Sequence, residues 1–238
     1  MKKHLIRWLG LFLIVVAVIG VTIISAAEPT SKTAGLVLED MPIVLPANAT
    51  EVEKTAAKEL QHYLREITGG ASSIVTEGVN LESAIYLGAT KLAEANKVTY
   101  TDNNGMGEGW AIKAIGSDLV ITGGAQRGTL YGVYHLLEDV FGVRWWNMWE
   151  EYVPSMADAV LPFDFELKGE PVFADRGLYV NDNIQTLYYV RNRMNGFTSN
   201  GPVEYGGEEY FARPYHVHTF SRYFPPFYTE PTSERAAV

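Results

Sequence analysis

The residue types best suited to ligand chemistry lie in the last third of the chain. Arg176 lies within an otherwise apolar run, residues 173–180, which predicts a buried strand. Burying a guanidinium without a partner is costly. Arg176 therefore either pairs with a carboxylate, such as Asp175 or Asp182, or reaches a ligand at the end of the strand. Asn181 and Asp182 follow the run directly, where the loops after barrel strands carry functional groups.

A second candidate is the pair His216 and His218, whose spacing places two imidazoles on one side of a strand. Metal sites use this spacing, but no third ligand is evident in the sequence. A polar rim that contacts sugar and a purely structural role are the other interpretations. We take Arg176, Asn181, Asp182 and His218 as candidate substrate-binding residues, and we predict no metal, no cofactor and no catalytic residue.

The loop at residues 123–128 reads Gly-Gly-Ala-Gln-Arg-Gly and lies between a predicted strand and a predicted helix. Phosphate-binding loops occupy such positions. This one lacks the Lys-Ser/Thr of a P-loop, and its glycine spacing differs from that of a dinucleotide-binding loop. It predicts a tight turn with close backbone packing.

Aromatic side chains cluster shortly after the second predicted helix, at Trp145, Trp146, Trp149 and Tyr152. Exposed aromatic rings mark binding surfaces and can stack on sugars, whereas buried ones would fill a domain junction. Glycosidases need two carboxylates that flank the scissile bond. The acidic pairs at 150–151 and 208–209 are adjacent, so on a strand they would point to opposite faces, and they predict mainly solvated charge.

Composition excludes several classes of function. The 238 residues contain no cysteine, which rules out disulfides and thiolate chemistry. The 19 basic and 28 acidic residues give a net charge of −9, which argues against nucleic acid as a partner. The hydrophobic fraction of 47% is that of a globular protein.

The first 27 residues have the pattern of a secretory signal peptide. Three basic residues precede an apolar run that starts at Trp8 and ends at Ile24, and the small residues Ser25 and Ala27 fit cleavage after Ala27. The alternative is an uncleaved membrane anchor made by the same run, which would be the only membrane contact. The remainder is expected to be secreted, periplasmic or at the cell surface, with its oligomeric state open.

Hydrophobic periodicity predicts a mixed α/β (α+β) domain over residues 28–168, a mixed-sheet sandwich with two principal helices. A capping box at Thr50 and Glu53 begins the first helix, and Gly69 ends it. The other predicted elements are a hairpin at 35–38 and 43–45, strands at 73–76 and 84–88, a short helix at 91–95, a hairpin at 109–115 and 118–122, and helices at 126–141 and 186–194.

Two stretches resemble the domain that precedes the catalytic barrel in bacterial α-glucuronidases and β-N-acetylhexosaminidases, of glycoside hydrolase families 67 and 20. They are residues 55–69, on the first helix, and residues 121–146, with the pattern G-x-x-R-G-x-L-Y-G-x-Y-x-x-L-E followed by Gly-Val-Arg-Trp-Trp. The resemblance implies a carbohydrate-active protein whose first domain is not catalytic. It also implies that residues 169–238 begin a TIM-type (β/α)₈ barrel, in which Arg176 matches a sugar-contacting arginine.

The barrel that this resemblance implies needs about 250 residues, whereas only residues 169–238 come after the first domain. We therefore expect an N-terminal fragment of a secreted glycoside hydrolase of polysaccharide catabolism, inactive by itself, with its catalytic acids beyond Val238. The alternative is a stand-alone extracellular carbohydrate-binding module. In both cases the expected partner is an oligo- or polysaccharide.

Overall fold

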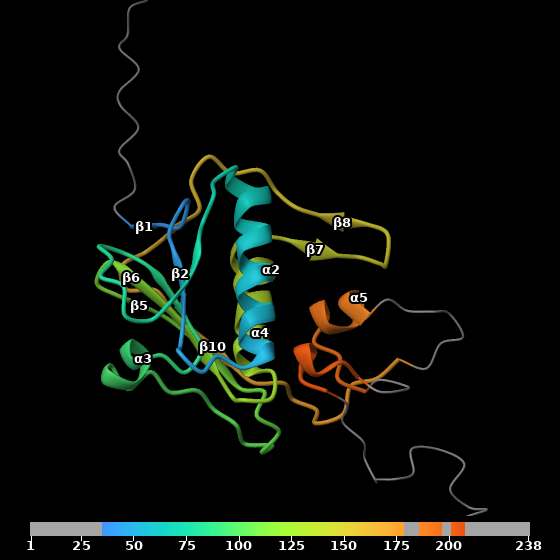
Figure 1. The fold of residues 1–238 in the computed structure, drawn as a ribbon. Helices are drawn as coiled ribbons and strands as arrows, with labels where there is room; N and C mark the ends of the chain where they lie inside the picture. The colour runs from blue at the N-terminus through green and yellow to red at the C-terminus, as the bar shows by residue number, and fades with distance from the viewer. Residues whose placement is uncertain (1–34, 179–185, 197–200, 208–238) are drawn as a thin grey trace, which may run out of the picture. The chain divides into compact units, whose positions relative to one another are not determined.

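The computed structural model describes residues 35–178, 186–196 and 201–207, all within one unit that begins at Gly35. Its centre is a six-stranded sheet with the order β10-β5-β6-β4-β2-β3 (Figure 1). The strands are β2 (Ile43–Leu45), β3 (Ile74–Thr76), β4 (Ile85–Leu87), β5 (Trp110–Ile115), β6 (Asp118–Gly123) and β10 (Glu166–Gly169). Strands β3, β2, β4 and β6 are parallel, whereas β5 runs antiparallel to both of its neighbours, β6 and β10.

The long helix α2 (Glu51–Thr68) forms because both of its ends carry strong signals. The Thr50 hydroxyl accepts the Glu53 backbone N–H at 3.2 Å, and the Glu53 carboxylate accepts the Thr50 N–H at 2.8 Å. Gly69 ends the helix in the left-handed conformation, with φ of 82°. The predicted capping box and helix are confirmed.

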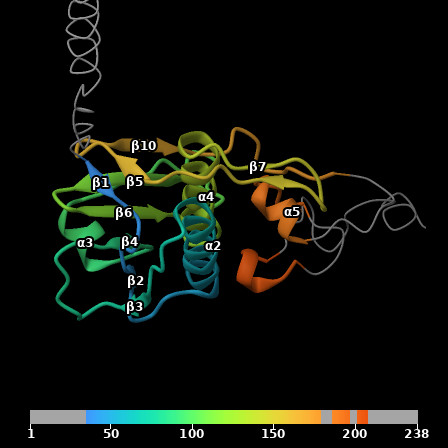
Figure 2. The ribbon, with the colours of Figure 1, turned by 90° about the horizontal axis from the view of Figure 1, so that it is seen from above.

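Helices α2 and α4 (Gly128–His135) lie side by side on one face of the sheet, and the short α3 (Lys91–Ala95) lies on the opposite side (Figure 2). A π-helical turn, η1 (Leu136–Val140), continues α4. Apolar side chains of α2, α4 and the sheet form the core, among them Leu60, Leu64, Ile112, Ile121 and Leu130. The prediction of a mixed-sheet sandwich with two principal helices is confirmed.

The predicted hairpin of residues 35–38 and 43–45 is wrong. Strand β1 (Leu36–Val37) pairs with β9 (Val160–Leu161) in a separate two-stranded sheet, while β2 joins the central sheet. Between β1 and β2, Asp40 adopts a positive φ of 60°, and this turn directs the chain from the two-stranded sheet to the central sheet.

The predicted first barrel strand at residues 173–180 is also wrong where the structure describes it, because residues 173–178 form no strand. Phe173 is 71% exposed. The Arg176 N–H donates to the Asn195 side chain, and the Arg176 carbonyl accepts the N–H groups of Asn195 and Gly196, so local partners replace a strand ladder. Residues 179–180 lie outside the described residues, and the wider barrel stays a prediction.

Two short elements come next in the chain, α5 (Thr186–Arg191) and the 3₁₀ turn η2 (Val203–Tyr205). The helix begins where the sequence predicted and is shorter than predicted. Within the described part of the chain, no helix has the length and apolar character needed to cross a membrane. The predicted signal peptide or anchor at residues 1–27 lies outside the described residues.

Candidate functional site

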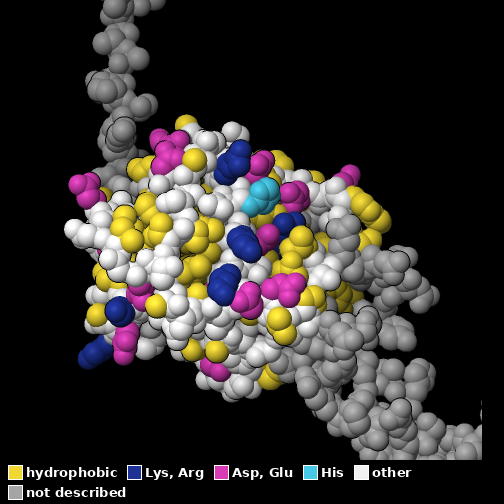
Figure 3. Space-filling view, in the orientation of Figure 1, with side chains coloured by type: hydrophobic (Ala, Val, Ile, Leu, Met, Phe, Trp, Pro, Cys, Tyr) yellow, Lys and Arg dark blue, Asp and Glu magenta, His cyan; other side chains and the backbone are white. Residues whose placement is uncertain are grey.

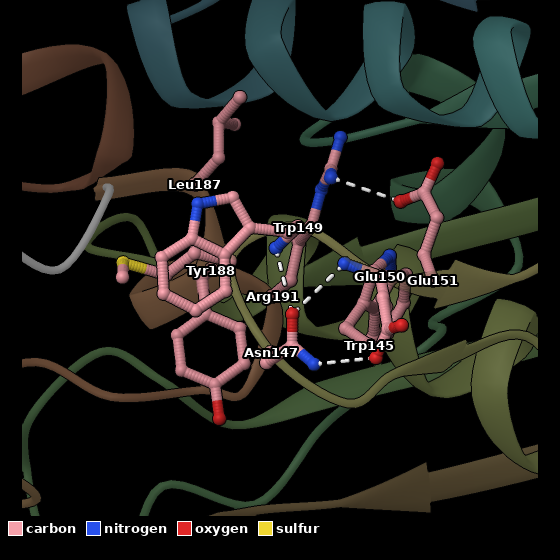
Figure 4. A pocket seen from close by; sticks show the side chains of 9 residues that line it. Trp145, Asn147, Trp149, Glu150, Glu151, Leu187, Tyr188 and Arg191 are labelled. Carbon is pink, nitrogen blue, oxygen red and sulfur yellow. Dashed lines mark hydrogen bonds and ion pairs between the residues drawn. The ribbon is translucent and has the colours of Figure 1, made fainter.

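A pocket of about 250 Å³ lies between a β-hairpin and α5 (Figure 4). The hairpin consists of β7 (Arg144–Trp145) and β8 (Glu151–Tyr152), which pair antiparallel. The residues that line the pocket are Trp145, Asn147, Met148, Trp149, Glu150, Glu151, Leu187, Tyr188 and Arg191. We call this the tryptophan pocket.

Asn147 shapes the turn of the hairpin. Its side-chain oxygen accepts the backbone N–H groups of Trp149 at 2.8 Å and Glu150 at 2.9 Å, and its amide nitrogen donates to the Glu150 carboxylate at 2.8 Å (Figure 4). Asparagine stabilises turns in this way, by replacing a backbone acceptor with its own side chain. The turn leaves Trp149 with 78% of its surface exposed.

The base of the hairpin is fixed to α2 through Tyr63. The buried Trp145 indole donates to the Tyr63 hydroxyl at 2.7 Å, and that hydroxyl donates to the Glu151 carboxylate, also at 2.7 Å. The two rings meet edge to face, 5.6 Å apart. Burial, together with the hydrogen bond to Glu151, raises the pKa of Tyr63 well above its usual range, so the phenol remains a donor.

Arg191 holds α5 against the same hairpin. Its guanidinium lies 2.9 Å from Glu59 of α2 and 3.2 Å from Glu151, and it lies over the Tyr63 ring at 5.2 Å. The Tyr188 hydroxyl adds a bond to the Trp146 carbonyl at 3.4 Å. Both walls of the tryptophan pocket are therefore anchored to the sandwich.

The aromatic cluster serves two purposes. Trp145 is buried, and its ring packs edge to face against Tyr63 of α2 and Tyr134 of α4, within the sandwich. A role in filling a junction between two domains stays a prediction. Trp146 is 62% exposed and Tyr152 is 50% exposed, and their rings stack at 6.1 Å with an interplanar angle of 14°. Figure 3 shows apolar side chains at the edge of the molecule where this hairpin lies in Figure 1. Together with Trp149, this pair gives the hairpin the exposed aromatic surface of a binding site.

The pocket carboxylates have local partners. Glu151 accepts hydrogen bonds from Tyr63 and Arg191, both at its Oε2 atom, so it connects the hairpin to α2 and α5. Glu150 is exposed and bonded to Asn147. The prediction of solvated charge fits Glu150, but Glu151 is an ion-pair partner.

Arg176 belongs to a separate, buried polar cluster. Its Nη2 lies 2.7 Å from the Glu108 carboxylate and 3.1 Å from the Tyr131 hydroxyl. Arg127 contacts the same carboxylate at 3.0 Å, and the Asn195 amide contacts it at 3.1 Å. Glu108 and Arg127 have no exposed side-chain surface. The neighbouring hydroxyl is also affected, because burial and then Glu108 raise the pKa of Tyr131.

This cluster supports the ion-pair interpretation of Arg176, with a different partner from those that the sequence indicated. Asp175 and Asp182 are close to Arg176 in the sequence, but the carboxylate that reaches Arg176 is that of Glu108, 68 residues away in the chain. The sequence offered one local sign that Glu108 has a special role: it is a charged residue between two glycines, just before a strand. The substrate-binding role of Arg176 stays a prediction.

The other candidate residues, Asn181, Asp182 and His218, lie outside the described residues, and the structure does not place them beside Arg176. His216 lies there too. In the described ranges, no group of three or more His, Asp or Glu side chains could hold a metal ion.

Close packing explains the loop at residues 123–128, as predicted. A Cβ atom at Gly128 would overlap the carbonyl oxygen of Gly109, and one at Gly124 would overlap the backbone of Gly107. The Arg127 side chain donates to the carbonyls of Tyr205 and Gly207, so this loop also holds the η2 segment.

Residues 33–136 match the family model described as the glycosyl hydrolase family 67 N-terminus. The match supports an α-glucuronidase-like N-terminal domain over these residues. The match does not confirm the likeness to family 20. A solved structure of a family GH115 4-O-methyl-α-glucuronidase with specificity for decorated arabinogalactans is 16% identical, with a TM-score of 0.46, and the alignment covers 59% of this chain and 19% of that chain. No curated protein matches the sequence.

The matched region of the α-glucuronidase-like domain ends at residue 136, within the turn that continues α4. It contains α2, the four parallel strands, β5 and the Glu108 and Arg127 pair. The β7–β8 hairpin and α5, which form the tryptophan pocket, lie beyond it. The relation to glycoside hydrolases thus rests on the sandwich, and the pocket lies outside the matched residues.

Proposed function

We propose that this chain is the non-catalytic N-terminal part of a secreted, carbohydrate-active protein, a glycoside hydrolase of polysaccharide catabolism. The observation that carries the proposal is the match of residues 33–136 to the family 67 N-terminus. The signal-like residues 1–27 and the net charge of −9 support an exported protein whose partner is carbohydrate and not nucleic acid.

The ion pairs of three glutamates support an accessory role. The buried Glu108, the partly buried Glu59 and the exposed Glu151 each accept from at least one arginine, so they hold segments of the domain together. Hydrolysis of a glycosidic bond requires a proton donor and a second carboxylate on opposite sides of the bond. We propose that these groups come from residues beyond Val238.

A second function, that of a stand-alone extracellular carbohydrate-binding module, is favoured by the exposed Trp146 and Trp149. The two functions predict different reading frames beyond the codon of Val238. An in-frame continuation of several hundred codons supports the accessory domain, and a stop codon at that point would leave the binding module as the better account.

Activity provides the direct test. The purified chain should release no sugar from glucuronoxylan, whereas the product of a longer reading frame should release it. Release by the chain alone, abolished by Glu150→Gln or Glu151→Gln, would contradict the proposal. Mass spectrometry of the exported protein tests secretion, with an N-terminus at Glu28 expected after cleavage.

A further inference from the structure

We propose that the tryptophan pocket binds an uncharged pyranose ring and discriminates against uronic acids. This inference rests on the proposed carbohydrate-related function and names the ligand class of a site outside the family-matched residues. It rests on three features of the pocket: its aromatic surface, its charge and its size.

The aromatic surface suits a sugar ring. Trp149 is 78% exposed beside the pocket, and α5 provides Tyr188 and the apolar Leu187 on the facing wall (Figure 4). An amphipathic aromatic ring gives contact area at little entropic cost, and pyranose C–H groups pack on its face. The asparagine turn and the Tyr188–Trp146 bond fix both walls before a ligand arrives.

The charges of the pocket select against an anion. Arg191 is the one cationic side chain among the lining residues, and Glu59 and Glu151 already engage it. Glu150 adds an exposed carboxylate at the rim, bonded to the neutral Asn147 amide. A sugar hydroxyl can donate to this carboxylate, whereas the carboxylate of a uronic acid would be repelled by it.

The size of the pocket limits the ligand. Its volume of about 250 Å³ lies just below the roughly 300–1,000 Å³ of pockets that enclose drug-sized ligands. One pyranose ring fits such a space, and the rest of an oligosaccharide would lie outside the pocket. The expected ligand is therefore one unit of a neutral polysaccharide backbone.

The test is a titration of the purified chain, monitored by tryptophan fluorescence and calorimetry. The probes are xylohexaose, cellohexaose and mannohexaose as neutral ligands, and oligogalacturonate as the acidic one, all up to millimolar concentration. We expect saturable binding of at least one neutral probe and weaker binding of oligogalacturonate. Trp149→Ala should weaken neutral binding about tenfold, and Trp149→Phe should retain most of it.

Two further variants separate the aromatic and charge contributions. Phe163→Ala removes an aromatic ring that is 52% exposed and is not among the residues lining the pocket, so it should leave binding unchanged. Glu150→Gln keeps an acceptor for Asn147 but removes one negative charge. It should weaken neutral binding no more than about twofold, because the amide oxygen still accepts from a sugar hydroxyl but carries no charge, and it should strengthen oligogalacturonate binding about threefold at low salt.

Several outcomes would overturn the assignment. One is the absence of saturable binding of all three neutral probes, and another is tighter binding of oligogalacturonate than of any neutral probe. A dimer that Trp149→Ala dissociates in sedimentation would show that the aromatic surface is a protein contact instead. If a neutral sugar binds but the gene encodes no barrel, only the accessory-domain proposal fails. If the barrel exists but no sugar binds here, only the pocket assignment fails.

Discussion

The guanidinium of Arg176 lies 2.7 Å from the carboxylate of Glu108, a side chain with no exposed surface. This ion pair connects the segment that follows β10, which contains Arg176, to the residue just before β5, Glu108. Arg127 and Asn195 contact the same carboxylate. One buried acid thus connects four parts of the chain. Its loss should affect stability more than any single surface charge.

Glu108→Gln tests this role. The substitution keeps the shape of the side chain but leaves two arginines without the shared negative charge. Breaking a buried pair in this way costs about 3–5 kcal/mol, and we expect a loss of that size in the free energy of unfolding. Urea denaturation monitored by circular dichroism measures it. Glu166→Gln, which breaks an exposed pair with Lys113, is the control and should leave the midpoint close to that of the wild type.

Arg176→Ala should destabilise the domain by about 2–4 kcal/mol, because it leaves part of Glu108 uncompensated. Binding of neutral sugars at the tryptophan pocket should not change, because Arg176 does not line it. Arg176→Lys should restore only part of the stability, since an ammonium cannot reproduce the guanidinium bonds to both Glu108 and Tyr131. Reduced sugar binding at unchanged stability would instead support the ligand role predicted from the sequence.

Alkaline pH should unfold the domain through its buried tyrosines. Burial is the main cause that raises the pKa values of Tyr63, Tyr131 and Tyr134 in the folded state. The unfolded chain loses these protons near pH ~10, so their contribution is complete below that pH and falls as the pH rises above it. Above that pH, and below the raised pKa of the folded state, each buried tyrosine should reduce the free energy of unfolding by about 1.4 kcal/mol for every unit that the pH rises.

The measurement is urea denaturation at a series of pH values above neutrality, with phenolate absorbance recorded in parallel. Tyr63→Phe serves as the matched variant, because it removes one titrating group and should reduce the slope by one tyrosine's share. Ionisation of all tyrosines in the folded protein near pH ~10 would show that burial does not hold these protons.

Gly128→Ala tests the packing interpretation of the loop at residues 123–128. The added methyl group would meet the backbone of Gly109 and Gly123, and neither can rotate away. We expect a loss of about 3 kcal/mol, at the upper end for overpacking. Gly105→Ala is the comparison: it has open space but a φ of +66°, so conformational strain alone should cost about 1 kcal/mol. Equal losses would contradict a packing role.

The sequence predicted those elements whose signals are local. Helix α2 was placed correctly because the Thr50–Glu53 capping box and Gly69 mark its two ends. The β5–β6 hairpin was found because two β-rich runs flank one tight turn at Gly116, which has a positive φ of 62°. The pairing of β1 with β9 was missed, because no local pattern encodes a contact between Leu36 and Leu161.

The site was less predictable for the same reason. The sequence identified the aromatic cluster but could not separate the buried Trp145 from the exposed Trp149, since that depends on Tyr63, 82 residues from Trp145 in the chain. The sequence also indicated that Arg176 needs a partner, because burying an unpaired guanidinium is costly. The identity of that partner depends on tertiary packing that brings Glu108 to it.

The Glu108 cluster has a practical consequence for dissecting the protein. A piece that stopped at Lys168, the predicted limit of the first domain, would lose Arg176 and Asn195, and the buried carboxylate would keep Arg127 and the Tyr131 hydroxyl. The carbonyl bonds of Arg127 extend to Gly207. The shortest autonomous folding unit among the described residues should therefore end after residue 207, and expression boundaries drawn from the family match at residue 136 would cut through it.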